Sequence, residues 1–315
     1  MGSFIARRLL AMVPLLLIIT FAVYGLVLIV PGDPARTLAG GFKADPAEVV
    51  RIRHALHLDQ PFVNQYWRWL THALRGDLGQ SLFQNESVAH GIATRLPPTL
   101  SLALGGLVVS VLIGLSLGIF AGTRPGTAVD RAATTASSVG IAMPDFWVAI
   151  ILLVVLAVKA HILPALGYVK FGTSPWQWAR HLLMPWLALG LAGGATLARF
   201  IRSSLIDTLD QEYVRTARAM GIRERRVIGQ LALKNALTPA LTILGIQFAY
   251  TLGGTVILEG IFSINGLGGY ILSAIDKKDL PIVQGVVLFI ALVFVVVNLL
   301  VDLLYGVLNP KVRVS

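Results

Sequence analysis

Six apolar stretches divide this 315-residue chain, and each is about as long as a helix that crosses a lipid bilayer. A bilayer core about 30 Å thick needs about 20 apolar residues of helix. Because 56% of the residues are hydrophobic and 13% are charged, the chain has too little polar surface to cover so large an apolar core in water. The sequence therefore predicts an all-α integral membrane protein with six spans, at residues 9–30, 99–122, 134–160, 182–200, 239–258 and 282–305.

The basic residues predict how the spans are oriented. Arg and Lys gather before the first span, between spans two and three, between spans four and five, and after span six. Basic residues concentrate in cytoplasmic loops, so both termini are expected to be cytoplasmic. The same rule accounts for the formal charge of +10, and we therefore expect lipid rather than nucleic acid around the chain. With no cysteine, the chain has no disulfide and no thiolate metal site.

This topology divides the chain into four parts. Residues 1–30 form a cytoplasmic N-terminus and span one, whose apolar run is longer than that of a signal peptide and is interpreted as a retained anchor. The others are an extracytoplasmic helical segment (31–98), a core transmembrane domain (99–308) with a cytoplasmic loop at 202–238, and a cytoplasmic tail (309–315). In the exported segment, helices are predicted at 46–58, after the N-cap residue Asp45, and at 65–74. Four residues are expected at the lipid–water interface: Trp67, Trp69, Trp176 and Trp178.

The cytoplasmic loop at 202–238 contains signals for a short helix. Asp210 suits the N-cap, Glu212 the first turn, and Gly221 the left-handed position after the last turn. A helix of about ten residues, about 15 Å long, is marginal in water, so another surface must hold it. Small residues would let it enter a groove of a partner protein and its arginines could pair with acidic groups there, whereas a helix lying on anionic lipid is the alternative. The other residues of this predicted coupling helix are Tyr213, Arg215, Thr216, Ala217, Arg218 and Ala219.

Motifs along nearly the whole chain resemble one family. Arg215-Thr216-Ala217, Gly221 and Leu231-Ala232-Leu233 resemble the EAA loop of permease subunits of binding-protein-dependent ABC importers, although Arg215-Thr216 departs from the usual Glu-Ala. Further stretches are similar to the dipeptide, oligopeptide and nickel branch of that family. They are Val30-Pro31-Gly32-Asp33-Pro34, Leu78-Gly79-Gln80-Ser81, Arg95-Leu96-Pro97-Pro98-Thr99-Leu100, Met143-Pro144-Asp145-Phe146-Trp147 and the run from Glu259 to Gly268.

The resemblance implies a type I ABC importer transmembrane domain in a bacterial inner membrane. Such a subunit forms half of a translocation pathway together with a second homologous permease. Two ATPase subunits, which bind ATP and Mg, and an extracytoplasmic substrate-binding protein complete the importer. The expected cargo is a di- or oligopeptide, and a nickel chelate or haem remains open because the binding protein sets much of that choice.

The chain itself is not expected to be an enzyme or to hold a cofactor or metal. No lysine follows a glycine, so the Gly-Lys-[Ser/Thr] end of a P-loop is absent and ATP must be bound elsewhere. A secondary transporter is the alternative, but it would be expected to have inverted repeats and midplane ion ligands, and no repeat is evident. The run from Gly114 to Gly118 matches the nucleophile elbow of hydrolases; inside an apolar stretch, we interpret these glycines as a face for close helix packing.

Ionisable residues within the spans are further candidates for function, because charge at bilayer depth is costly. Asp145 follows Pro144 near the middle of span three, where a helix break exposes backbone groups. Its carboxylate either meets the amino group of a passing peptide or pairs with the partner permease. Glu259, near the exported end of span five, is a candidate for an outer gate. Two neighbouring pathway candidates are Phe146 and Asn265, the latter standing where the branch usually has proline.

Overall fold

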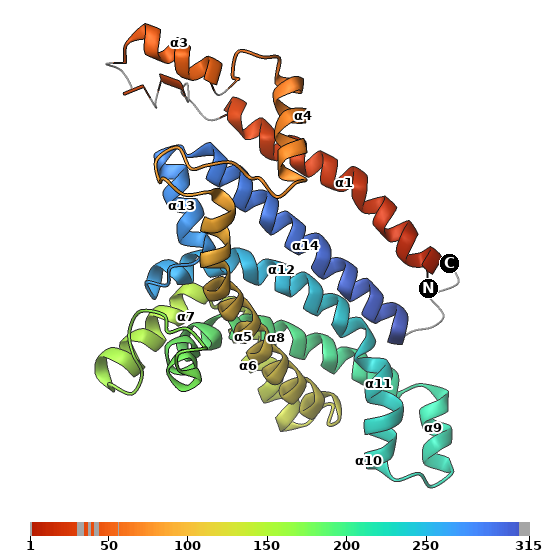
Figure 1. The fold of residues 1–315 in the computed structure, drawn as a ribbon. Coiled ribbons are helices and arrows are strands. Elements are labelled where there is room, and N and C mark those ends of the chain that lie inside the picture. Colours follow the sequence, from red (N-terminus) through yellow and green to blue (C-terminus); the bar gives the residue numbers. More distant parts are fainter. Residues whose placement is uncertain (1, 30–34, 37–38, 41–43, 56, 309–315) are drawn as a thin grey trace. The chain divides into compact units, whose positions relative to one another are not determined.

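The computed structural model describes residues 2–29, 35–36, 39–40, 44–55 and 57–308, and most of these are helical (Figure 1). The one β-bridge among them joins Gln80 to Ser87. The all-α prediction is confirmed for this part of the chain. The residues fall into two compact units: unit 1 contains 97–268 and 296–308, and unit 2 contains 2–96 and 269–295. The predicted tail at 309–315 and the motif at 30–34 lie outside the described residues.

Unit 2 is built on the packing of one short helix against the first long one. Tyr66 of α4 (Phe62–Ala73) is buried, and its hydroxyl lies 2.9 Å from that of Thr20 in α1 (Gly2–Ile29). Tyr24 of α1 donates a hydrogen bond of 3.1 Å to Oε1 of Gln65. The rest of unit 2 consists of α3 (Pro46–Ala55), the start of α5 (Val88–Gly122), most of α13 (Leu267–Lys277) and the first half of α14 (Leu280–Leu308).

The two helices predicted between residues 46 and 74 are present with shifted ends. Asp45 Oδ1 accepts the N–H of Ala47 at 3.0 Å, as expected at the start of α3, but the helix ends at Ala55. α4 begins three residues before its predicted start, because Pro61 occupies its N-cap with a φ of −54° that suits helix entry. Trp67 is exposed, whereas the ring of Trp69 packs against Tyr24 with 5.5 Å between centroids. Trp67 alone of this pair has the exposure of an interfacial anchor.

Within unit 2, one residue from each of two sequence motifs contacts α13 or the turn that follows it. Ser81 Oγ donates to Oδ2 of Asp279 at 2.5 Å, so the Leu-Gly-Gln-Ser motif is tied to the turn between α13 and α14. Arg95 forms an ion pair of 3.1 Å with Glu86, and its guanidinium carbon lies 4.1 Å from the ring centroid of Tyr270. This cation–π contact and the burial of the phenol join α5 to α13. Burial, chiefly, raises the pKa of Tyr270 to about 12.

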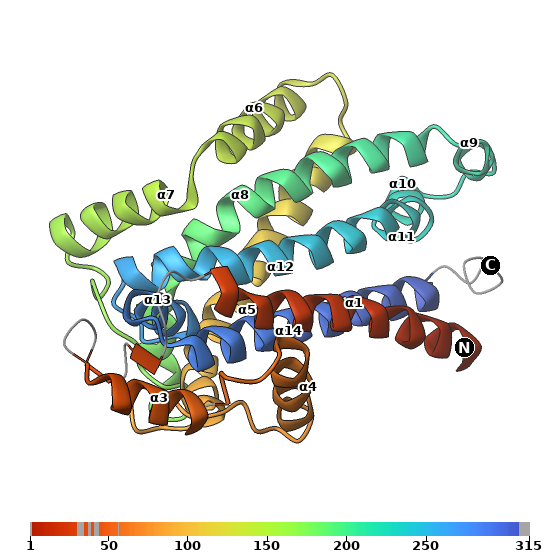
Figure 2. The same cartoon turned by 90° about the horizontal axis from the view of Figure 1, so that it is seen from above.

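Unit 1 is organised around one long helix, α8 (Pro175–Leu209), against which α6, α7 and α12 pack (Figure 2). Ser174 caps α8, and its hydroxyl accepts the N–H of Gln177 at 3.3 Å. The bounds of the elements around α8 are α6 (Ala128–Ala142), α7 (Asp145–Leu152), the π-helix η2 (Leu153–Lys159) and α12 (Thr238–Ile261). Between α8 and α12 lie α9 (Glu212–Ala219), α10 (Glu224–Arg226), η3 (Val227–Ala232) and α11 (Leu233–Ala236).

The glycines of α5 let it approach α8 closely. A Cβ added to Gly118 would lie 2.7 Å from Cβ of Ile201, and one added to Gly114 would lie 2.6 Å from Cδ2 of Leu197. Real Cβ atoms are not found so close to other heavy atoms, so α8 fills the space that these glycines leave. Ser116, between them, donates to the carbonyl of Leu112 at 2.6 Å inside the helix. The prediction of a packing face, rather than a nucleophile elbow, is confirmed.

The predicted break near Pro144 is also confirmed. α6 and the α7–η2 pair meet at an angle of 98°. Pro144 has a φ of −64° and a ψ of 137°, so α6 ends before it and α7 begins after it. Near the start of α8, Trp176 is exposed, as expected of an interfacial anchor. Trp178 instead packs against Trp186, with 4.8 Å between ring centroids, and is partly buried.

Among the described residues, four helices are long and apolar enough to cross a membrane: Val88–Gly122, Pro175–Leu209, Thr242–Ile261 and Leu280–Val301. The bent pair of α6 with α7–η2 gives a fifth candidate. The apolar stretch of α1, Met12–Gly25, is shorter than a full membrane span.

Candidate functional site

Helix α9, in the predicted coupling loop, follows α8 almost directly. It has eight residues, Glu212–Ala219, instead of the expected ten or so. Its N-cap is Gln211, and no side chain caps it. The prediction of Asp210 as the N-cap is wrong. Asp210 is the C-cap of α8 with helical dihedral angles, because α8 continues to Leu209 and leaves two residues, Asp210 and Gln211, before α9. Glu212 lies in the first turn, as predicted.

Gly221 ends α9 as predicted. Its φ is +76°, in the region that glycine adopts readily. The N–H of Gly221 donates to the carbonyl of Arg218 at 2.9 Å, and the N–H of Ile222 donates to that of Ala217 at 3.2 Å. This pair of bonds is a Schellman motif, which satisfies carbonyls that the helix end leaves open. A Cβ on Gly221 would meet nothing within 4 Å, so its backbone angle, and not space, requires glycine here.

One face of α9 is anchored to its own chain. Val214 and Ala217 are buried against Val227 of η3, with Leu209, Ile222 and Leu231 around them. Ala217 was expected to let the helix enter a partner's groove. Its small side chain instead packs against Val227 of the same chain. The opposite face, with Tyr213, Thr216, Ala219 and Met220, is exposed.

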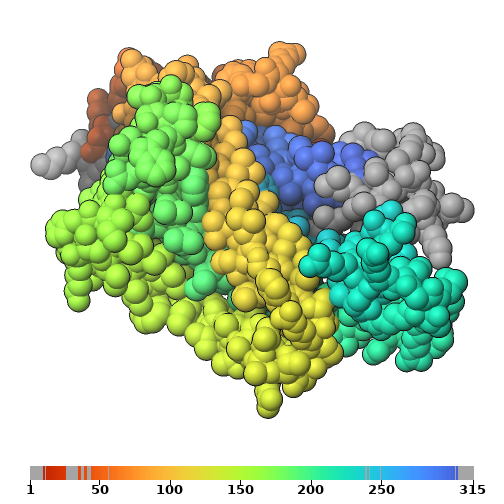
Figure 3. All heavy atoms as spheres, turned by 90° about the horizontal axis from the view of Figure 1, so that it is seen from below, coloured from red at the N-terminus to blue at the C-terminus, as the bar shows by residue number. Residues whose placement is uncertain are grey.

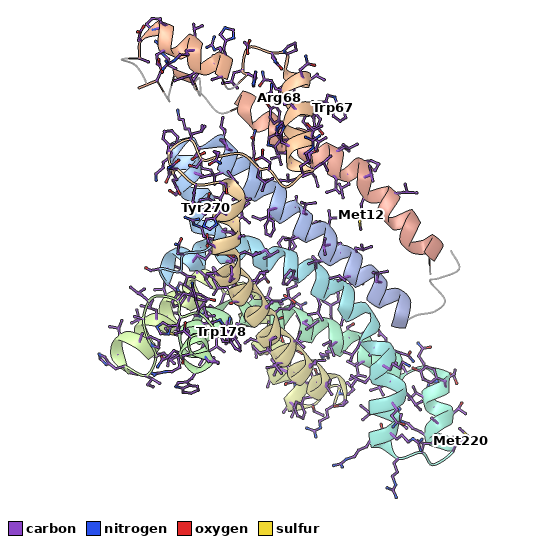
Figure 4. All side chains as sticks on the ribbon, viewed as in Figure 1. Met12, Trp67, Arg68, Trp178, Met220 and Tyr270 are labelled. Atoms are coloured by element: carbon purple, nitrogen blue, oxygen red, sulfur yellow. The ribbon has the colours of Figure 1, made fainter. Side chains whose placement is uncertain are left out.

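This exposed face is displayed at the end of unit 1. The α9–α11 segment, coloured cyan in Figure 3, forms a lobe on the molecular surface. Met220 is 69% exposed and points away from the helices (Figure 4). Sequence reasoning missed Met220, although its position one residue before the predicted helix-ending glycine was a usable signal.

The arginines of α9 pair with carboxylates of the same chain. Arg218 binds Glu224 through two nitrogens, at 2.7 and 3.2 Å, and Arg215 binds Glu212 at 3.0 Å. The hydrogen bonds to Arg218 lower the pKa of Glu224, and those to Glu224 raise the pKa of Arg218. The predicted pairing with acidic groups of a partner would have to compete with these bonds. Of the two pairs, Arg218–Glu224 links α9 to α10, whereas Arg215–Glu212 lies within α9.

A buried ion pair, which sequence reasoning also missed, lies where α8 approaches α6. Arg202 donates to Asp130 from both Nε and Nη2, the latter at 2.7 Å. Asp130 also accepts the N–H of Gly126 at 2.9 Å, so its carboxylate binds the turn before α6 as well. The side chain of Asp130 is 5% exposed. Since 72 positions separate the partners, no local pattern indicated the pair.

Asp145, the pathway candidate in span three, lies at the first position of α7 and lines a cavity of about 340 Å³. Gln247, Thr251 and Thr196 supply polar groups to the same wall. Phe146, beside Asp145, is 44% exposed and does not line this cavity. The structure therefore separates these two neighbouring candidates.

The cavity of Asp145 adjoins a second cavity of about 540 Å³. Ile141, Thr196 and Phe200 line both, and Arg199 and Arg202 of α8 line the second. A hollow with a carboxylate at one end and guanidinium groups at the other thus runs along α8.

Glu259, the other intramembrane candidate, is buried. Its Oε1 accepts from Thr99 at 2.6 Å, and Thr99 Oγ1 accepts the N–H of Leu267 at 2.8 Å. A Cβ on Gly266 would lie 2.3 Å from Oε1 of Glu259, so the loop closes tightly over this carboxylate. Asn265, in the same loop, is exposed. Glu259 is therefore linked through Thr99 to the backbone of the loop, whereas the side chain of Asn265 lies on the loop's exposed side.

Two family models match the chain over most of its length. The model of the "Binding-protein-dependent transport system inner membrane component" matches residues 114–314, and a model of the N-terminal part of such membrane components matches residues 1–103. The chain belongs to this family. This inner membrane component therefore carries the α9 loop, the Asp145 cavity and the Asp130–Arg202 pair within the first match.

Relatives of this inner membrane component align from end to end. The glutathione transport system permease protein GsiC of Salmonella paratyphi A is 38% identical over 313 residues, 99% of each chain. A Brucella abortus protein, named provisionally as a peptide transport system permease, is 39% identical over 313 residues, again 99% of each chain. A solved structure of the MetNI methionine ABC transporter in an inward-facing conformation is similar with a TM-score of 0.55. At 16% identity, over 70% of this chain and 96% of that one, it shows the fold alone.

Proposed function

We propose that the chain is one of two permease subunits of an ATP-driven importer of short peptides. A second homologous permease completes the pathway, two ATPase subunits supply bound ATP and Mg, and an extracytoplasmic binding protein delivers the cargo. The family match supports the role in binding-protein-dependent transport. The relatives' names, one for glutathione and one for peptides, support the cargo class.

The proposed topology has six spans with both termini in the cytoplasm. α1 supplies the first span, residues 31–98 form an extracytoplasmic helical segment that docks the binding protein, and residues 99–308 form the core with its coupling loop at 202–238. The four long apolar helices and the bent fifth candidate support this arrangement. The exposure of Trp67 and Trp176 fits their placement at the exported lipid–water interface.

The observation that carries the proposal is the two-sided character of α9. Val214 and Ala217 anchor one face to η3, while Tyr213, Thr216 and Met220 remain exposed on the other. A short helix fixed in this way moves as one body with η3 and α11. An ATPase that binds the exposed face therefore has a lever with which to shift the spans between outward- and inward-open states.

Cross-linking tests the proposal directly, because the chain has no cysteine. In the assembled importer, a thiol-to-amine cross-linker on Met220→Cys is expected to join the chain to an ATPase subunit, identified by mass spectrometry. Asp276→Cys, exposed on α13 and proposed to lie on the other side of the membrane, is the matched control and should give no such product. Equal cross-linking from both positions, or from neither, would refute the coupling assignment, as would uphill transport by the purified chain alone.

A further inference from the structure

The hollow along α8 has opposite charges at its two ends. Asp145 lines the first cavity, Arg199 lines the second, and Thr196 of α8 lines both. The first cavity, at about 340 Å³, is within the size range of ordinary small-molecule sites. Its wall is formed by α6, α7, α8 and α12, all of unit 1, and Asp145 is the one charged side chain that lines it among the described residues.

The carboxylate of Asp145 has no hydrogen bond or ion pair with any residue that the structure describes. This differs from the other carboxylates packed in unit 1: Asp130 binds Arg202, and Glu259 accepts from Thr99. The side chain reaches to within 3.8 Å of where a Cβ on Gly254 would lie, so α12 leaves space in front of it. A carboxylate held in an apolar wall without a counter-charge favours a cationic ligand.

The polar groups near Asp145 add hydrogen-bonding capacity to that end. Gln247 is accommodated against α8 only because residue 193 is a glycine, since a Cβ there would lie 1.6 Å from Nε2 of Gln247. Oε1 of Gln247 is buried and has no hydrogen-bond partner within the described part of the chain. Thr251 lies one helical turn further along α12 and lines the same cavity. An acceptor that is buried and unsatisfied beside a carboxylate fits an ammonium donor.

Arg199 supplies the opposite charge. Its side chain is exposed, and like that of Asp145 it makes no ion pair with the described residues. Arg202, one turn further on, is already occupied by Asp130 through two nitrogens. Of the two guanidinium groups in the second cavity, that of Arg199 is therefore the one available to an anionic ligand.

From these placements we infer that the hollow is a binding site for a zwitterionic short peptide, with its ammonium group at Asp145 and its terminal carboxylate at Arg199. The inference rests on the proposed function and adds a recognition chemistry inside the permease, separate from the choice made by the binding protein. It gives the unpaired Asp145 a role in binding cargo rather than in pairing with the second permease.

The geometry of α8 also limits the length of the peptide. Leu189, which lies in the wall at the Asp145 end, and Arg199 are ten positions apart on one helix, which is about 15 Å along its axis. An extended chain covers about 3.5 Å per residue, so about four residues span this distance. Because both side chains reach into the hollow, somewhat shorter peptides also fit, whereas longer ones must fold back to place both termini at once.

Binding of four forms of tetra-alanine to the purified importer complex, without its binding protein, tests the inference by equilibrium dialysis. The forms are free, N-acetylated, C-amidated and blocked at both ends. Loss of one charge-assisted contact is expected to raise Kd about 10-fold to 100-fold. Asp145→Asn should therefore weaken binding of the free and amidated peptides but not of the acetylated ones, and Arg199→Gln should weaken binding of the free and acetylated peptides but not of the amidated ones.

The matched controls are Asp276→Asn and Arg131→Gln, which change exposed charges that line neither cavity. They should leave all four Kd values unchanged. If Asp145→Asn weakens every form equally, or none, Asp145 does not bind the ammonium group and the inference is overturned. Absence of any peptide binding by the wild-type complex also overturns it, whereas the proposed function is judged separately by ATP-dependent peptide uptake with the binding protein present.

Discussion

Arg202 of α8 and Asp130 of α6 form a bidentate ion pair, with Nη2 of Arg202 2.7 Å from Oδ2 of Asp130. The same carboxylate accepts the N–H of Gly126. Arg202 lies two turns before the end of α8, from which the chain enters α9. The pair therefore connects the start of α6 to the helix that leads into the proposed coupling lobe.

Asp130→Ala is expected to lower the free energy of unfolding by about 3 kcal/mol, because it leaves the Arg202 charge partly buried without a partner. Thermal unfolding of the purified permease in detergent measures this. Arg202→Lys keeps the charge but loses the two-pronged geometry, so its effect should be smaller. Arg131→Gln, an exposed neighbour on α6, is the control. An unchanged unfolding temperature for Asp130→Ala would contradict the structural role of the pair.

Gly221→Val should uncouple transport from ATP hydrolysis. A side chain at this left-handed position costs about 1–2 kcal/mol, which reduces the population of the ordered α9 end about 5-fold to 30-fold. The ratio of cargo imported to ATP hydrolysed, measured in proteoliposomes, should fall accordingly. Gly221→Asn is the matched variant: asparagine tolerates this backbone angle and a Cβ meets nothing within 4 Å, so coupling should be largely retained. If valine and asparagine behave alike, backbone conformation is not the reason for glycine.

The Arg218–Glu224 pair predicts a pH dependence of the α9 lobe. Arg218 lowers the pKa of Glu224 below its ordinary value of 4.5, so the pair stabilises the lobe fully above that value and less as the pH falls through the lowered pKa. Both side chains are more than one-third exposed, which limits the contribution to about 0.5 kcal/mol. Hydrogen exchange of α9 amides should therefore be slightly faster in Glu224→Gln than in wild type at neutral pH. The difference should vanish in acid, and a difference that persists there would point to another cause.

Thr99→Val tests the role of Glu259 in holding the loop after α12. The change removes the hydroxyl that donates to Glu259 and accepts from the N–H of Leu267. Two buried polar groups then lose this partner, and stability should fall by about 1–3 kcal/mol. Thr123→Val serves as the control, because the hydroxyl of Thr123, just after α5, donates to the carbonyls of Ile119 and Phe120 in the last turn of that helix. Equal unfolding temperatures for the two variants would show that the Thr99 bridge does not stabilise the loop.

Much of the fold could be predicted because its signals are local. Pro144 cannot continue α6, and Gly221 ends α9, for reasons contained in the backbone of a few residues. Helices α3 and α4 were likewise predicted. The start of α4 is displaced by three residues because Pro61 is its N-cap, and α3 ends three residues earlier than predicted. The capping role of Asp210 was wrong, because the length of α8 depends on what packs along it.

The sequence by itself determined the apolar helices, the positions where helices break or end, and the family. These follow from composition, short-range backbone preference and ordered motifs, respectively. The tertiary structure alone decided which side of each helix faces which neighbour. It turned Ala217 toward Val227, brought Arg202 to a carboxylate 72 positions away, enclosed Glu259 beside Thr99 and left Asp145 facing a cavity. The physical reason is that helix rotation and approach are set by the summed packing of distant side chains, which no local stretch of residues encodes.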